Sequence, residues 1–174
     1  MPFGELATRI SVWLALVLWL ASECLALNPK KLRLRRWLFG LSAAVFLAHV
    51  ILSFHVFYDW SQTTALADVR RQTRDVTGLE WSIGLWINYA FAALWLAEAL
   101  WLCLAPIRHA ERPRSMTWLV RGIFWFMAFN GAFVFVKGPQ RWLGFMLCLS
   151  VIAAWRAERK LARAKSNVQL ISAE

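Results

Sequence analysis

The sequence predicts an all-α integral membrane protein in a single domain, residues 1–174. Its expected architecture is a bundle of five transmembrane helices with a short amphipathic helix on the membrane surface. Hydrophobic residues make up 60% of the 174-residue chain, which also contains 12 Trp and 12 Phe. Windows of about 20 apolar residues, enough to cross a ~30 Å hydrocarbon layer, cover most of the sequence between Ile10 and Trp155. The Lys and Arg residues gather at the ends of these windows, as in other multi-pass membrane proteins.

The first predicted span covers residues 10–27. Glu5 and Arg9 are the only charged residues before it, whereas residues 30–36 after it are strongly basic. A secretory signal peptide has the opposite charge distribution, so we interpret this segment as a permanent helix. The positive-inside rule then predicts that the N-terminus lies outside and that the basic segment lies in the cytoplasm.

The second predicted span, residues 37–58, is expected to be the central helix of the bundle. Gly40, Ala44 and Ala48 share one face, where the backbone of another helix can approach closely. A second stripe carries polar residues, among them His49, which cannot face lipid tails without a cost in free energy. We therefore expect protein to cover both faces.

Residues 61–77 are predicted to form the amphipathic surface helix in the outer loop between the second and third spans. Ser61 can cap its start, and Gly78 supplies a stop signal. Trp60 and Trp81 bracket the segment as interfacial anchors. Two roles are open: a lid over the bundle, or a surface helix that only completes a long connection.

Three further spans are predicted at residues 82–105, 117–136 and 140–155. The last two are expected to form an antiparallel hairpin. The basic tail, residues 156–174, then lies on the cytoplasmic side, where its Lys and Arg residues can contact anionic head groups.

Polar residues of the spans fall into two layers when each is placed by its distance from the end of its span, at ~1.5 Å per residue. The outer layer comprises His49, His55, Tyr58, Asp59, Asn88 and Asn130. The inner layer comprises Glu23, Glu98 and Arg121. The outer layer is the candidate site for cofactor binding or proton transfer, and the inner layer is an intramembrane charge cluster.

The outer layer is of interest because histidine titrates near neutral pH and also binds haem iron. His55 and Asp59 are one helical turn apart, so the carboxylate can orient the imidazole. His49 and His55 lie about 120° apart on one helix and cannot sandwich one iron. A haem b would need one of them together with another ligand, such as Met127 or a residue of a partner chain. In the structural alternative, the histidines hydrogen-bond Asn88, Asn130 or Ser53 and hold the bundle together.

The inner layer has a structural and a functional interpretation. Pairing of Arg121 with Glu98 or Glu23 would neutralise a charge that is costly to bury alone. The glutamate left without a cation would then stay protonated and exchange protons. His109, in the loop after the third span, is expected to be solvated.

Several function classes are disfavoured by the sequence. It contains no Ser-His-Asp or Cys-His arrangement, no glycine-rich phosphate loop and no metal-ligand spacing, so we expect neither an enzyme nor a metal site. The formal charge of +10 does not indicate nucleic-acid binding, because the basic residues lie at span ends, where they set topology.

Three segments, FHVFYDWS, ALADVRRQT and WINYAF, within residues 54–91, resemble parts of small bacterial polytopic membrane proteins. The resemblance implies a bacterial inner membrane and transfers no site.

The sequence favours a non-enzymatic subunit or accessory factor of a larger membrane assembly, with lipids and with other membrane subunits or itself as partners. The alternative is a haem- or quinone-binding protein for electron or proton transfer that uses the outer histidine layer. A small solute or ion transporter is the third class.

Overall fold

In the computed structural model, which describes residues 2–26 and 28–171, the chain is all-helical, as predicted. The long helices are α1 (Phe3–Leu25), α2 (Leu32–Phe57), α4 (Ile83–Leu104), α6 (Arg114–Phe129) and α7 (Arg141–Ile171). The shorter elements are a 3-10 turn (Pro29–Lys31), α3 (Gln62–Thr77), α5 (Pro106–Glu111) and a π-helix (Asn130–Val134).

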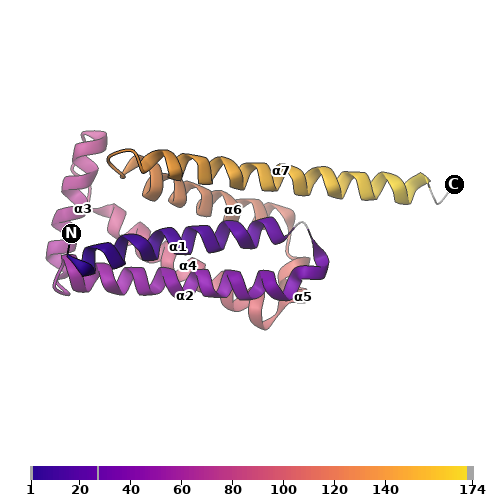
Figure 1. The fold of residues 1–174 in the computed structure, drawn as a ribbon, viewed down its shortest axis with the longest axis horizontal. Helices are drawn as coiled ribbons and strands as arrows, with labels where there is room; N and C mark the ends of the chain where they lie inside the picture. Colours follow the sequence, from indigo (N-terminus) through magenta and orange to yellow (C-terminus); the bar gives the residue numbers. More distant parts are fainter. Residues whose placement is uncertain (1, 27, 172–174) are drawn as a thin grey trace.

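The long helices run side by side and define two ends of the bundle (Figure 1). The N-terminus lies at one end, which α3 crosses; we call this the α3 end. The α1–α2 connection and α5 lie at the opposite end, which we call the α5 end. The helix α7 extends beyond the other helices at the α5 end and carries the C-terminus (Figure 1).

Four helical segments of the described chain are long and apolar enough to cross a membrane: α1, α2, α4 and the stretch Arg114–Val134. The fifth predicted span, residues 140–155, lies in α7, which is not one of these four. Charged residues lie close to both ends of its apolar stretch: Arg141 at the start, and Arg156 and Glu158 at the end. Four such helical segments are typical of a membrane protein. The fifth span remains a prediction.

The predicted start and stop signals of the crossing helix α3 are confirmed. The Ser61 hydroxyl accepts a hydrogen bond from the Thr64 amide at 3.3 Å, and Gly78 adopts a left-handed conformation with φ of 77°. Before α3, Asp59 and Trp60 also have positive φ values, 45° and 59°. Two left-handed residues in a row end α2 and turn the chain into α3.

The core is built from aromatic side chains of several helices. Trp95 of α4 is 1% exposed, and its ring stacks on Phe46 of α2 with centroids 4.5 Å apart. Its indole Nε1 donates a hydrogen bond to the Ser42 hydroxyl at 3.2 Å. Phe124 of α6 meets Trp95 edge-on, with centroids 5.2 Å apart. This cluster ties α2, α4 and α6 together in the middle of the bundle.

One packing prediction is wrong. The face of α2 that contains Ala44 and Ala48 is exposed, whereas Phe39, Ser42 and Ala43 are buried. Large aromatic side chains bury more apolar area than alanine, so the helix turns its phenylalanines toward the core. The described part of α2 thus packs on α1 and α4 with one side only, and is not covered by protein on both faces as predicted.

The α6–α7 hairpin depends on one close approach. A Cβ atom added at Gly144 of α7 would lie 2.1 Å from the carbonyl oxygen of Ala132 in the π-helix. Only glycine allows the two backbones to come this near. The widened π turn therefore packs directly against α7.

Candidate functional site

Two adjoining cavities of about 330 and 500 Å³ lie at the α3 end of the bundle. We call them together the α3-end chamber. The residues that line both cavities are His49, Val69, Gln72, Asn88, Met127 and Gly131. These residues come from α2, α3, α4, α6 and the π-helix, so the chamber lies where these elements meet. Because α3 contributes Val69 and Gln72 to both cavities, it forms part of their wall.

Hydrogen bonds and close packing hold α3 against the bundle. The Tyr58 hydroxyl donates to Asp68 Oδ2 at 3.0 Å, and the Tyr89 hydroxyl donates to Gln62 Oε1 at 2.7 Å. Ala65, in the first half of α3, is completely buried. Burial, together with the negative charge of Asp68, raises the pKa of Tyr58 to about 12. Tyr58 therefore remains a hydrogen-bond donor throughout the physiological pH range.

His49 is the central polar residue of the chamber. Its Nδ1 lies 2.9 Å from the carbonyl oxygen of Thr8 and 3.3 Å from the Ser11 hydroxyl, both on α1. A carbonyl oxygen can only accept, so Nδ1 carries the proton in this bond. In the neutral imidazole, Nε2 is then the acceptor. The backbone of α1 thus fixes both the tautomer and the orientation of a histidine that borders both cavities.

In the described part of the chain, the side chains of His49 and His55 do not hydrogen-bond the predicted partners. The Ser53 hydroxyl donates to the backbone oxygen of His49 at 2.8 Å, and Asn130 Nδ2 donates to the backbone oxygen of Phe126 at 2.8 Å. Both side chains thus bond the carbonyl one turn back on their own helix, a local option that Ser and Asn often take. The partners of His49 come from α1. The sequence signal that could have indicated them is the polar pair Thr8 and Ser11 near the start of that helix.

His55 and Asp59 do not form the predicted pair. Within the described residues no hydrogen bond or ion pair joins them, and both are exposed and outside the lining of the chamber. The helix ends at Phe57, and Asp59 has a positive φ, so the helical spacing that would bring the two together is lost. His55 lies near the Trp60 ring instead, with centroids 6.5 Å apart.

The other predicted outer-layer residues do reach the chamber. Asn88 lines both cavities, Tyr58 lines the smaller one and Asn130 lines the larger one. Four of the six candidates, with His49 included, thus line the chamber. Gln72, which also lines both cavities, was missed because its position depends on how α3 folds over the bundle.

Aromatic rings form much of the wall of the smaller cavity. Phe46 and Trp95 are stacked, and the rings of Phe54 and Tyr89 are also stacked, with centroids 6.1 Å apart. Phe91 completes this wall. An apolar cavity with flat walls and a few convergent polar groups suits a small ligand with an aromatic ring.

The predicted inner layer forms a buried network at the α5 end. Arg121 Nε lies 3.1 Å from Glu23 Oε2, which confirms one of the two expected pairs. Glu98 is not left without a cation, as the alternative required: Arg112 Nη1 lies 2.6 Å and His109 Nε2 3.2 Å from its Oε2. The proton-exchange interpretation of an unpaired glutamate is therefore wrong.

His109 is also placed differently from the prediction. It is 8% exposed and lies in α5, where it contacts Glu98. Pro106 occupies the first turn of this short helix, a position that proline favours. The helix folds back over the end of α4 and buries the histidine. A six-residue helix is too short to show a hydrophobic period in the sequence.

No group of three or more His, Cys, Asp and Glu side chains suited to a metal ion occurs in residues 2–26 and 28–171. Comparison with protein families, curated proteins and solved structures finds no match for this chain.

Proposed function

We propose that this chain is a non-enzymatic, multi-pass membrane protein that binds a quinone-class ligand in the α3-end chamber. One observation carries the proposal. His49 is held by the Thr8 carbonyl through Nδ1 and borders both cavities, and this arrangement presents Nε2 as a hydrogen-bond acceptor. A quinol hydroxyl is a donor that suits this acceptor.

The remaining walls match the rest of a quinone. Its ring is flat and apolar and can lie against the rings of Phe54 and Tyr89, which are half-buried and line the smaller cavity. Its carbonyl oxygens accept hydrogen bonds, and the side-chain amide of Asn88 is a donor at the chamber wall. Gln72 also lines the wall, and its Nε2 already donates one hydrogen bond to Asp68 Oδ2 at 2.8 Å. Asn88 is exposed while it lines both cavities, so its amide is accessible to a ligand.

The proposed setting is a bacterial inner membrane, with the α3 end outside and the α5 end in the cytoplasm. The basic segments 30–36 and 108–114 both belong to the α5 end, in agreement with the positive-inside rule. The first half of α7 serves as the fifth span in this arrangement. The helix α3 then lies at the outer surface, with Trp60 and Trp81, both exposed, at the interface.

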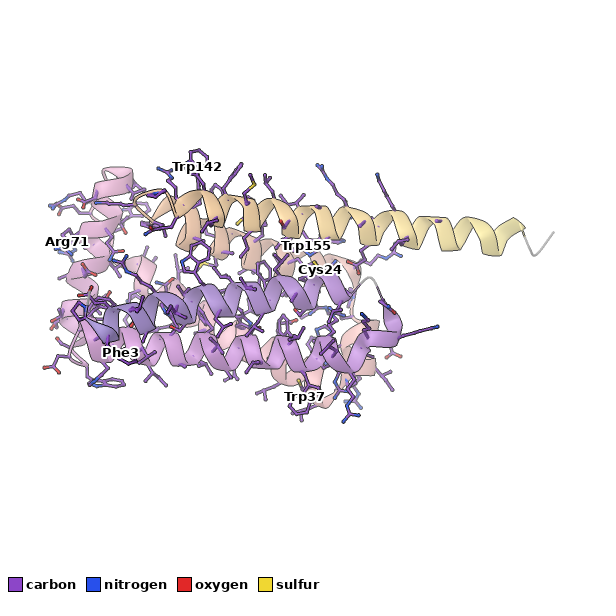
Figure 2. The ribbon with its side chains drawn as sticks, viewed as in Figure 1. Phe3, Cys24, Trp37, Arg71, Trp142 and Trp155 are labelled. Atoms are coloured by element: carbon purple, nitrogen blue, oxygen red, sulfur yellow. The ribbon has the colours of Figure 1, made fainter. Side chains whose placement is uncertain are left out.

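A second candidate function is that of a subunit in a larger membrane assembly. The observation that favours it is the apolar outer side of α7, where Trp142, Leu143 and Met146 are 60–65% exposed. Trp142 points away from the bundle, whereas Trp155 points toward α1 (Figure 2). Another membrane protein, or a second copy of this chain, can pack on this side.

A titration tests the proposed ligand. The detergent-purified protein is titrated with a short-chain quinone, and quenching of tryptophan fluorescence, to which Trp95 in the chamber wall contributes, reports binding. We expect His49→Ala to raise the Kd about tenfold, the equivalent of one lost hydrogen bond. His55→Ala is the matched control, because His55 is on the same helix and does not line the chamber; its Kd should not change.

Two results would count against this function. Equal dissociation constants for the two histidine variants would remove His49 from the site, and quenching that never saturates would show that no site exists. A Soret band that disappears in His49→Ala would instead assign a haem b, for which His49 and Met127 border the same cavities. Stoichiometric co-purification of other membrane proteins would support the subunit role.

A further inference from the structure

A third cavity, of about 240 Å³, lies at the α5 end. Its lining includes charged or titratable side chains from six helices and one connection. They are Glu23, Arg35, Glu98, His109, Arg112, Arg121 and Glu158. Three arginines and three glutamates therefore border one small space, far along the bundle from the chamber at the α3 end.

Each glutamate has a close partner. Glu98 is contacted by both Arg112 and His109. Arg121 bridges Glu23 at 3.1 Å and Glu158 at 2.7 Å. The Trp155 indole also donates to Glu23 Oε2 at 2.6 Å. The carboxylates are thus engaged by groups of the protein itself.

Arg35 is the exception among the three arginines. Its closest carboxylate oxygen, Glu23 Oε1, is 4.0 Å away. Its Nε is inaccessible to solvent and makes no hydrogen bond within the described residues. The Arg35 side chain is 21% exposed and lines the cavity, so the Nη groups of this guanidinium, rather than the inaccessible Nε, are the donors offered to an additional acceptor there.

We propose that the α5-end cavity binds a phosphate group, with Arg35 as its main ligand. A guanidinium is planar and donates two parallel hydrogen bonds to phosphate oxygens. Arg112 and Arg121 border the same space, but their charges are offset by the glutamates that they contact, so the positive field at this end comes from the basic segments 30–36 and 108–114 as a whole. The phosphate belongs either to a phospholipid head group or to a free phosphorylated molecule.

A matched pair of variants tests the proposal. Arg35→Gln removes the guanidinium from the cavity, whereas Arg33→Gln removes an exposed arginine of the same helix that does not line it. Delipidated protein is heated with increasing inorganic phosphate, and the rise in Tm gives the apparent affinity. We expect the apparent Kd to increase at least tenfold in Arg35→Gln and to stay unchanged in Arg33→Gln.

A second measurement identifies the source of the phosphate. Phospholipid retained by the protein after mild detergent extraction is counted by native mass spectrometry. If the wild type and Arg33→Gln retain phospholipid and Arg35→Gln loses it, the bound phosphate belongs to a lipid head group. A phosphate-dependent Tm without retained lipid assigns a free phosphorylated ligand.

The proposal would be overturned if both glutamine variants behaved alike in both measurements. Should Arg35→Gln fail to fold, Arg35→Lys keeps the charge and loses the planar fork, and it should still weaken phosphate binding several-fold. His49→Ala should leave phosphate binding unchanged. The site is thus independent of the quinone-class ligand proposed at the other end.

Discussion

Nδ1 of His49 on α2 donates to the backbone carbonyl oxygen of Thr8 on α1, over a distance of 2.9 Å. This contact joins two adjacent helices near the α3 end and orients the imidazole beside the chamber. The imidazole of His49, which was expected to hydrogen-bond other polar side chains, thus bonds a backbone carbonyl oxygen instead.

Replacing His49 should also change stability. His49→Leu removes the bond to α1, and we expect a loss of about 1 kcal/mol in the free energy of unfolding, the usual net value of one hydrogen bond. Unfolding of the detergent-solubilised protein by a denaturing detergent measures it. His55→Leu is the control and should stay within about 0.5 kcal/mol of wild type. A destabilised His55→Leu would contradict this account.

The close approach at Gly144 leads to a second prediction. Gly144→Ala should destabilise the protein by about 3 kcal/mol or more, because the new methyl group would overlap the Ala132 carbonyl and separate the π-helix from α7. Gly122→Ala on α6 is the matched control, since no neighbouring atom lies within 4 Å of the added Cβ. This control should be neutral or up to about 1 kcal/mol more stable, because alanine favours helix more than glycine. Equal effects in the two variants would refute the packing argument.

Glu98 should be essential for the stability of the α5 end. Glu98→Ala leaves Arg112 and His109 buried without their carboxylate, and we expect a loss of about 3–5 kcal/mol. The control is Glu111→Ala, which removes an exposed glutamate from α5. A double-mutant cycle of Glu98 and Arg112 measures their coupling. A coupling energy near zero would show that the pair is not formed.

The Tyr58–Asp68 bond predicts a specific dependence on alkaline pH. The pKa of Tyr58 is about 12 in the folded protein, against about 10 in an unfolded chain. The unfolded state therefore loses its proton first, and the stabilisation is fully present below about pH 10 and is lost as the pH rises toward 12. Unfolding measurements across this range should show a decline that is smaller in Tyr58→Phe.

The same tyrosine gives a spectroscopic control. Asp68→Asn removes the nearby negative charge, so the pKa of Tyr58 should fall and tyrosinate absorbance should appear at lower pH. Tyr89 is the only other tyrosine in the chain, so comparison with Tyr58→Phe assigns the signal. An unchanged titration in Asp68→Asn would contradict the contact.

Local sequence determined the ends of α3 and the depth of the residues along each long helix. Ser61 and Gly78 mark the ends of α3 because a hydroxyl cap and a left-handed glycine act within one turn. The number of residues between each side chain and the end of its span also predicted that His49 and Asn88 lie at a similar depth, since an α-helix rises by a constant ~1.5 Å per residue. Both residues line the same cavity.

Only the tertiary structure decided which way each helix faces. Ala44 and Ala48 point outward because Phe39 and Phe46 turn α2 toward the aromatic core around Trp95. His109 became a buried partner of Glu98 because a short helix folds back across the end of α4. Rotation about a helix axis and the path of a short connection depend on large side chains brought together from distant parts of the chain. The depth of a residue along the bundle follows from local helix geometry, whereas the direction in which its side chain points depends on how the helices pack.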